Sequence, residues 1–429
     1  MNVDLLQVNS RSGVAKMILV AAIVVAILFA WIAVRMQVGN MFADLTPATD
    51  PNSQEIADMA VSMSPNDPMT AWLKASVSKS VFSLSQSVET VRLFEKTVQL
   101  APNDYRWWIE LGRAREQADK SPQAEAALVH ATKLAPANVF LRWQLGNFYL
   151  RQGRADEAFA ALRLATSKNH VYRDQVFSLA WDYFDKDVEK LEASVVTDTS
   201  VYPTLAMFYS VRGRAADAVR VWAKLSDEQK AEYPQFSKVM AQGLFDKRFF
   251  AQSIVFASQS EFDPDALPFT VSNAGFEKSV SMADSTLFGW KVTRTDTKLD
   301  VASDQSVKHS GSRSMRISFK GYAKAELYNL FQTVVVSPST SYKLKFWLRT
   351  ESLKSGGGPQ IEIVNANDDK LLTTSRPFSQ GTNDWQEVVI DIMTPENCDG
   401  ITIRTARAYC GDNCPIVGTI WYDDFELTK

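Results

Sequence analysis

Two adjacent aspartates, Asp423 and Asp424, stand in an otherwise apolar stretch near the end of the chain, which reads IWYDDFEL. Aromatic and β-branched residues at this density predict a core strand. Because successive side chains in a strand point to opposite faces, one carboxylate must face whatever the strand packs against. An unpaired buried carboxylate is costly, so some partner must neutralise it.

Three cysteines precede these aspartates: Cys398, Cys410 and Cys414. The stretch CGDNC would close a tight loop, so we expect a Cys410–Cys414 disulfide that leaves Cys398 over. Pairing of Cys398 with either of the others stays open, since three cysteines allow three pairings. Zinc is not expected, because a C-x₃-C pair supplies two ligands and no histidine lies near this loop.

Residues of the usual catalytic kinds are sparse. The chain has three histidines, His130, His170 and His309. The stretch GSRSM lacks the final Gly of a nucleophile elbow, and SGGGP lacks the Lys-Ser/Thr of a phosphate loop. A glycosidase acid pair has no fixed spacing and so leaves no motif among the 49 acidic residues. We predict a protein that is not an enzyme.

Composition sets the frame for the elements that must position these residues. The chain has 429 residues, 46% apolar and 22% charged, which suits two or three folded domains. Its formal net charge is −3 and no basic tract with interleaved aromatics occurs. We therefore expect no nucleic-acid partner.

The N-terminal region carries the clearest local signal. MILVAAIVVAILFAWIAV, residues 17–34, has no charge, Gly or Pro, and its 18 residues just span a bilayer as a helix. Arg11 and Lys16 precede it, and acidic residues follow Arg35 from Asp44 onward. This bias predicts a single-pass inner-membrane anchor at 17–35, a cytoplasmic tail at 1–16, a linker at 36–67 and extracytoplasmic domains, periplasmic in a Gram-negative cell. A cleaved signal peptide is the alternative, although no Ala-x-Ala site follows closely.

Residues 68–263 show a helical pattern that repeats after 34 residues. Small and large apolar positions recur in one frame: Pro102/Pro136, Leu111/Leu145, Gly112/Gly146, Ala124/Ala158, Leu128/Leu162 and Ala131/Ala165. This pattern resembles tetratricopeptide (TPR) repeats. It predicts four to six helix pairs, with a shortened second helix in the copy around FSLAWDYF.

The TPR resemblance implies a surface that grips a protein partner, and a rigid spacer is the plainer alternative. Tyr149, Arg151 and Arg154 are candidate ligand contacts. The alternative is that they complete the repeat fold or are simply solvated.

Residues 264–429 change to strand-like alternation with turn residues between, so eight to ten strands predict an antiparallel β-sandwich. An ordered series of motifs runs through it: NAGFE, FGW, HSGSRSMRI, QTVVVSPSTSY, FWLRT, DWQEV and WYDDFEL. Together they resemble the galactose-binding-like jelly rolls, in particular the carbohydrate-binding modules appended to bacterial glycoside hydrolases.

That resemblance implies a structural Ca²⁺ held by Glu277 with Asp423 or Asp424 and by backbone carbonyls of residues 309–312. The plain alternative is a Lys or Arg salt bridge without metal. The same resemblance also implies a glycan-binding site. Trp290, Trp347 and Trp385 fall in motifs that belong to the core, so the candidate contacts are residues on strands or loops that could line one sheet: Tyr322, Tyr328, Gln332, Arg404 and Tyr409.

The sequence thus predicts a multidomain chain: an N-terminal transmembrane helix, an all-α TPR solenoid and a C-terminal all-β jelly-roll sandwich. The expected role is a membrane-anchored envelope scaffold in bacterial exopolysaccharide production, export or attachment. A protein-interaction scaffold with a purely structural sandwich is the main alternative, and an accessory subunit of a glycan-degrading enzyme is the third.

Overall fold

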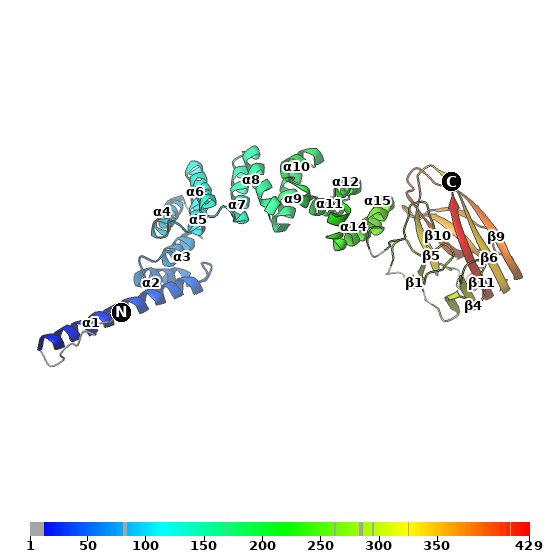
Figure 1. The fold of residues 1–429 in the computed structure, drawn as a ribbon, viewed down its shortest axis with the longest axis horizontal. Coiled ribbons are helices and arrows are strands. Elements are labelled where there is room, and N and C mark those ends of the chain that lie inside the picture. Colours follow the sequence, from blue (N-terminus) through cyan, green and yellow to red (C-terminus); the bar gives the residue numbers. More distant parts are fainter. Residues whose placement is uncertain are drawn as a thin grey trace, which may run out of the picture. The chain divides into compact units, whose positions relative to one another are not determined.

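The computed structural model describes residues 13–79, 84–168, 170–260, 263–282, 286–293, 296–324, 326–411 and 413–429. The chain divides into two compact units, Met1–Thr197 and Asp198–Lys429. The predicted architecture is confirmed: an apolar N-terminal helix, a region of paired helices and a two-sheet β-sandwich (Figure 1). Most of the expected cytoplasmic tail, including Arg11, lies outside the described residues.

The first helix, α1 (Gly13–Leu45), has 33 residues and is long and apolar enough to cross a membrane. It runs on through the first ten residues of the expected linker, and α2 (Ser53–Met63) follows within the same stretch. Gly39 explains the close approach of α1 to α2, because a Cβ there would lie 2.9 Å from Ser64 Cβ. Small buried side chains, Ala43, Ala57 and Ala60, continue this contact.

Four helix pairs complete the first unit. They are α3 (Pro68–Lys79) with α4 (Leu84–Leu100), α5 (Tyr105–Gln117) with α6 (Ser121–Leu134), α7 (Val139–Arg151) with α8 (Ala155–Lys168), and α9 (Arg173–Tyr183) with α10 (Val188–Val195), with a 3₁₀ turn, η1 (His170–Tyr172), before α9. The second helix of the fourth pair, α10, has 8 residues against 14 in α6 and α8. The predicted shortening is therefore confirmed.

The 34-residue repeat has a direct structural cause. Asp104 and Asn138, 34 positions apart, cap α5 and α7 by accepting from backbone amides two residues on. Gly112 and Gly146 face leucines of the partner helices: a Cβ at Gly146 would lie 2.5 Å from Leu162 Cγ. Glycine is thus required where the two helices of a pair touch.

The second unit begins with further helices: η2 (Thr199–Val201), α11 (Tyr202–Val211), α12 (Ala215–Trp222), α13 (Asp227–Ala231), α14 (Pro234–Asp246) and α15 (Phe250–Ala257). Of these, α11 pairs with α12 and α14 with α15. The described residues thus hold six helix pairs after α2, the upper end of the predicted range.

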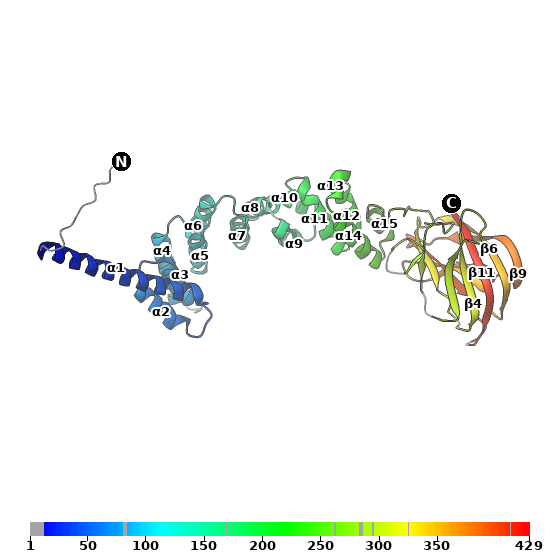
Figure 2. The same cartoon turned by 60° about the horizontal axis from the view of Figure 1, so that its bottom comes forward.

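The sandwich has two sheets around one core of apolar side chains. One has the order β1-β2-β5-β10-β7-β8, with strands β1 (Ser281–Met282), β2 (Lys291–Val292), β5 (Leu330–Val335), β10 (Gly400–Arg407), β7 (Pro359–Asn365) and β8 (Leu371–Thr374). The other has the order β3-β4-β11-β6-β9, with β3 (Leu299–Asp304), β4 (Ser314–Tyr322), β11 (Ile416–Thr428), β6 (Ser341–Ser355) and β9 (Gly381–Met393); Figure 2 shows β4, β11, β6 and β9 side by side. Pairing is antiparallel except between the two short strands β1 and β2.

Within the second unit, the turn between α14 and α15 is joined to the sandwich. Arg248 donates to Asp369 at 2.6 Å, and the Asp399 carboxylate accepts from the backbone N–H of Ala251 at 3.0 Å. Phe250 packs directly on Gly400, where a Cβ would come within 2.6 Å of its ring. The last helix pair and the sandwich therefore belong to one packed body.

Candidate functional site

A cationic and aromatic cluster lies on the outer face of the six-stranded sheet. Ile401 and Ile403 of β10 point into the core. Because side chains alternate along a strand, Arg404, which follows Ile403, points outward. Its guanidinium lies 3.9 Å from the centroid of the Tyr328 ring and donates from Nη2 to Glu362 Oε2 at 2.9 Å. Strand register sets Arg404 opposite Glu362 on β7 and Phe331 on β5. We call Tyr328, Arg404 and Glu362 the outer-sheet cluster.

This cluster has the chemistry of a saccharide contact. Tyr328 is 39% exposed and carries the Arg404 guanidinium over one face of its ring, while Arg404 and Glu362 are half-buried and hold each other in place. An aromatic face packs against the C–H side of a sugar ring, and fixed charged groups exchange hydrogen bonds with its hydroxyls. The ion pair with Glu362 leaves Arg404 with N–H donors for a ligand, because its five donors exceed what one carboxylate oxygen accepts.

The structure separates the other three candidate glycan contacts from this cluster. Tyr322 is 3% exposed and its hydroxyl donates to the Glu326 carbonyl. Gln332 is fully buried and donates to the Ser272 carbonyl. Tyr409 is 83% exposed on the loop after β10. The sequence did not identify Glu362 as a site residue. Its pairing with Arg404 depends on cross-strand register, which a single sequence does not show.

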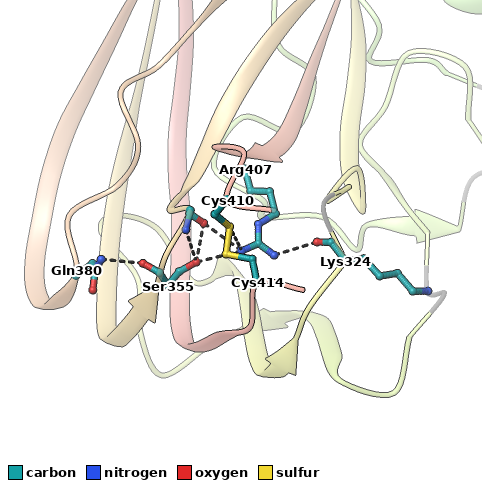
Figure 3. Close-up of a disulfide and its surroundings, with 7 residues drawn as sticks. Lys324, Ser355, Gln380, Arg407, Cys410 and Cys414 are labelled. Carbon is teal, nitrogen blue, oxygen red and sulfur yellow. Dashed lines mark hydrogen bonds between the residues drawn. A yellow bond between two sulfur atoms is a disulfide. The ribbon is translucent and has the colours of Figure 1, made fainter. Parts of the chain in front are cut away.

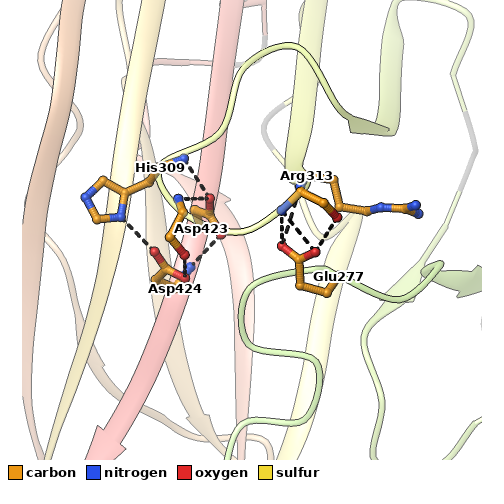
Figure 4. A network of polar contacts seen from close by, with 7 residues as sticks. Glu277, His309, Arg313, Asp423 and Asp424 are labelled. Atoms are coloured by element: carbon orange, nitrogen blue, oxygen red, sulfur yellow. Dashed lines mark hydrogen bonds and ion pairs between the residues drawn. The ribbon is translucent and has the colours of Figure 1, made fainter.

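The terminal aspartates lie in one polar network with the loop between β3 and β4 (Figure 4). Asp423 is fully buried, and one carboxylate oxygen accepts from the backbone N–H groups of His309 and Ser310 at 2.8 and 3.3 Å. Asp424 accepts from the Ser310 hydroxyl and contacts His309 Nδ1, both at 2.7 Å.

The expectation that the two aspartates point to opposite faces is wrong. Asp424 has φ of +48°, and the pairing of β11 with β6 shifts register between Asp423 and Glu426. This bulge breaks the two-residue alternation, so both carboxylates reach residues 309 and 310.

Glu277 contacts the next residues of the same loop. Its carboxylate accepts from the Ser312 backbone N–H at 2.9 Å and from the Ser312 hydroxyl. These hydrogen bonds, the hydroxyl first, lower the pKa of Glu277. A Cβ on Gly311, which has φ of +58°, would lie 2.1 Å from Glu277 Oε1, so the loop can close on this carboxylate only with glycine there.

We tested whether these three carboxylates fit the Ca²⁺ that the resemblance implies. Asp423 Oδ1 and Asp424 Oδ1 flank Gly275, lying 3.6 and 3.3 Å from the position of a Cβ there. The two aspartates thus offer oxygen ligands at one place, whereas Glu277 is engaged by Ser312. Across the described residues, no group of three or more His, Cys, Asp or Glu side chains is arranged to hold a metal ion.

The described contacts of Asp423 are hydrogen bonds rather than the salt bridge that was the plain alternative to a metal. Its described partners are backbone N–H groups of His309, Ser310 and Asp424 rather than a Lys or Arg side chain. Burial nevertheless raises the pKa of Asp423, because amide dipoles offset desolvation only in part and Asp424 adds negative charge.

Two of the three tryptophans expected in the core are not there. Trp290 is confirmed as a core residue at 3% exposure, but the prediction is wrong for Trp347 and Trp385, which are half-buried. The His309 ring stacks on Trp347 with centroids 3.9 Å apart and meets Trp385 edge-on. Trp347 therefore supports the histidine that contacts Asp424.

The loop after β10 carries a disulfide between Cys410 and Cys414, with Cα atoms 5.9 Å apart. Cys398 is a free cysteine, fully buried, and burial raises its pKa to about 11. Burial thus keeps Cys398 protonated and inert at neutral pH.

An apolar groove of about 430 Å³ lies over the first helices of the pairs in the first unit. It is lined mainly by aromatic and aliphatic side chains from α3, α5 and α7: Met69, Trp72, Tyr105, Trp107, Ile109 and Phe140. The charged residues of its lining are paired, since Glu110 contacts both Arg113 and Lys79 and Arg106 contacts Asp104. Among the residues that the structure describes, none forms a hydrogen bond with the buried Trp107 Nε1. The groove therefore suits an uncharged, apolar segment.

The three residues considered as repeat contacts also link neighbouring helices. Tyr149 donates to Glu125 at 3.0 Å, and Arg154 lies over the Tyr149 ring while pairing with the same carboxylate at 2.6 Å. Arg151 pairs with Glu116. Because Glu116 and Glu125 belong to the preceding pair, these contacts join successive pairs.

Comparisons with known proteins give likeness of fold alone. No protein-family model matches the sequence, and no curated protein matches it. A solved structure described as "CBM4 structure and function" is 11% identical, covering 37% of this chain and 98% of its own, with a TM-score of 0.28. TmCBM61 in complex with β-1,4-galactotriose is 18% identical over 38% of this chain and 99% of its own, with a TM-score of 0.25. MamA from Desulfovibrio magneticus RS-1 is 20% identical over 31% of this chain and 73% of its own, with a TM-score of 0.26.

Proposed function

We propose that this protein is a non-enzymatic, membrane-anchored scaffold of the bacterial envelope. In this proposal α1 is an uncleaved single-pass anchor, the paired helices bind a protein partner, and the sandwich binds a glycan outside the cytoplasm. The setting would be production, export or surface attachment of an exopolysaccharide. Identities of 20% or less and TM-scores below 0.3 to the solved structures support no functional assignment by themselves.

The outer-sheet cluster is the observation that carries the glycan part of the proposal. It combines a partly exposed ring with an arginine and a glutamate fixed against each other on one sheet. The test is a glycan array with the full chain in detergent, run with Ca²⁺ and again with a chelator. Binding to a polymeric glycan supports the proposal. An array without specific binding favours the alternative of an interaction scaffold with a structural sandwich.

For the protein partner, the proposal names the apolar groove as the binding site. An extended segment with an aromatic or aliphatic anchor would bury its side chain against Trp72 and Phe140 without meeting an unpaired charge. Peptides selected against the full chain should carry such an anchor, and Trp72→Ala should weaken their binding at least tenfold. Val211→Ala, at a 61% exposed position outside the groove, is the control. Equal losses in both variants would exclude the groove.

For Ca²⁺, the proposal is that Asp423 and Asp424 are ligands beside Gly275 and that Glu277 supports the loop. The support is a buried carboxylate with a raised pKa and two carboxylate oxygens at one place. A bound Ca²⁺ would supply positive charge and oxygen coordination there. Micromolar Ca²⁺ should raise the melting temperature of the wild type more than Mg²⁺ does, and Asp424→Asn should abolish that gain. An Asp391→Asn variant, at a remote exposed carboxylate, should keep it.

A further inference from the structure

A buried arginine lies against the disulfide. Arg407, at the end of β10, is 6% exposed (Figure 3). Its Nη1 donates to the Lys324 carbonyl at 2.9 Å, and its Nη2 donates to Ser355 Oγ at 3.2 Å, to the Gly357 carbonyl at 3.3 Å and to Cys410 Sγ at 3.3 Å. Its Nε is buried without a partner. All four acceptors are uncharged groups, and they are the partners that the described residues provide for this guanidinium.

Such an environment leaves the guanidinium charge incompletely compensated. Desolvation lowers the pKa of Arg407, and the Tyr322 hydroxyl of β4 raises it by a smaller amount. The neighbouring Asp296 carboxylate is paired with the Lys324 ammonium at 3.4 Å. A negative charge on Cys410 Sγ would lie at hydrogen-bond distance from the guanidinium and would complete the missing ion pair.

The two sulfurs of the disulfide differ in access. Cys414 is 5% exposed, and a Cβ on Gly356 would lie 3.3 Å from its sulfur. Cys410 is half-buried and follows Tyr409, which is 83% exposed. The more exposed of the two cysteine residues is therefore also the one beside the cation.

We propose that Cys410–Cys414 is a thiol–disulfide exchange site for dithiols, in which Arg407 holds Cys410 as a thiolate in the reduced form. A thiolate of the external dithiol attacks Cys410 Sγ, a mixed disulfide forms, and Cys414 leaves and takes a proton. The second external thiolate then attacks the external sulfur of the mixed disulfide, and Cys410 leaves as a thiolate paired with Arg407. The dithiol loses two electrons and becomes a cyclic disulfide, the protein disulfide gains them, and one proton goes to solvent.

Thiol–disulfide exchange at Cys410–Cys414 affects two loops of the sandwich, the hairpin after β6 and the loop between β10 and β11. The disulfide packs on the glycine hairpin after β6, where a Cβ on Gly357 would lie 2.6 Å from Cys410 Sγ. Reduction removes the covalent link that closes the loop between β10 and β11, so the conformation of that loop, with Tyr409, depends on the thiol state. This inference does not depend on glycan or partner binding.

The experiment follows alkylation of the full chain in detergent. The protein is reduced with dithiothreitol, pulsed with iodoacetamide across pH 5–10, and each cysteine is quantified by peptide mass spectrometry. Cys410 should react with a midpoint at least one pH unit below that of Cys414, and buried Cys398 is the slow internal reference. Equal midpoints for Cys410 and Cys414 in the wild type would overturn the proposal, and this comparison needs no variant.

Variants assign the effect to the arginine charge. Arg407→Gln should raise the Cys410 midpoint by at least one pH unit and make the disulfide about tenfold harder to reduce at equilibrium with dithiothreitol. Arg407→Lys keeps the charge and should keep the low midpoint, which a merely structural role of Arg407 does not require. A folded Arg407→Gln protein with an unchanged midpoint contradicts the assignment. Asp412, between the cysteines in sequence, lies outside the described residues, so Asp412→Asn is run in parallel and should leave the midpoint low.

Discussion

At the scale of single residues, the carboxylates of the C-terminal network show how one loop solves two opposite electrostatic problems. Glu277 is near solvent, and donors of Ser312 lower its pKa. Asp423 is fully buried, and burial raises its pKa despite two backbone donors from the same loop. The two groups therefore influence stability in opposite directions as pH changes.

Asp423→Asn tests the sign of this effect in the absence of divalent cations. A folded-state pKa above the ordinary value of 3.8 means that the native state holds a proton that the unfolded state has lost. The stability of the wild type relative to the variant should therefore be greatest at low pH and should fall as pH rises through the folded-state pKa of Asp423. Urea denaturation at a series of pH values from 3 to 8 measures this difference.

The matched variant Glu277→Gln should show the opposite slope. Its lowered pKa contributes stability that is present above the ordinary value of 4.5 and is lost as pH falls through the folded-state pKa. Parallel profiles for the two variants would contradict the assigned environments.

At the scale of elements, the helix pairs depend on close contacts made by glycine. A Cβ on Gly112 or Gly146 would lie 2.8 or 2.5 Å from the Cγ atom of the leucine it faces, Leu128 or Leu162. Leu128 belongs to a buried apolar cluster and Leu162 is fully buried, so neither leucine moves without disturbing its neighbours. The recurring Leu-Gly dipeptide is therefore a packing requirement rather than a flexible point.

Gly146→Ala should lower the free energy of unfolding by about 1–3 kcal/mol, because the added methyl group overpacks the contact with Leu162. The matched control is Gly243→Ala in the interior of α14, where nothing lies within 4 Å of the added Cβ. That change should stabilise the protein by about 0.5–1 kcal/mol through helix propensity. Thermal unfolding followed by circular dichroism measures both, and equal effects would argue against the packing account.

The elements differ in how far the sequence could predict them. The 34-residue spacing of Gly112 and Gly146 and the run of strand motifs were enough for both folds. The sequence did not predict that α1 extends to Leu45. Its contacts with α2 depend on isolated small residues, such as Gly39 and Ala43, that show no helical periodicity. The Arg404–Glu362 pair and the bulge at Asp424 depend on strand register, which is set by tertiary pairing.

At the scale of the whole molecule, the second unit is continuous from helices to sandwich. Asp399 accepts from the Ala251 backbone N–H at 3.0 Å and from the Asn367 side-chain amide at 2.5 Å, so it joins the start of α15 to two loops of the sandwich. Phe250 packs on Gly400 beside it. A sandwich produced without these helices would lose that packing.

Asp399→Ala should lower the free energy of unfolding of the Asp198–Lys429 unit by about 1–3 kcal/mol, since it leaves part-buried donors unsatisfied. Asp391→Ala, which removes an exposed carboxylate 4.0 Å from Lys343, should change it by less than about 0.5 kcal/mol. Differential scanning calorimetry compares the two. Separate transitions for helices and sandwich in the wild type would contradict a single cooperative body.

Glycan binding by the sandwich through the outer-sheet cluster is best tested by calorimetric titration of the full chain with an array-selected glycan. We expect saturable binding that weakens at least tenfold, about 1.4 kcal/mol, in Tyr328→Ala and in Arg404→Ala. Tyr183→Ala, which removes a 52% exposed tyrosine from the helical region, should bind like the wild type. Wild-type affinity in both cluster variants would contradict the claim.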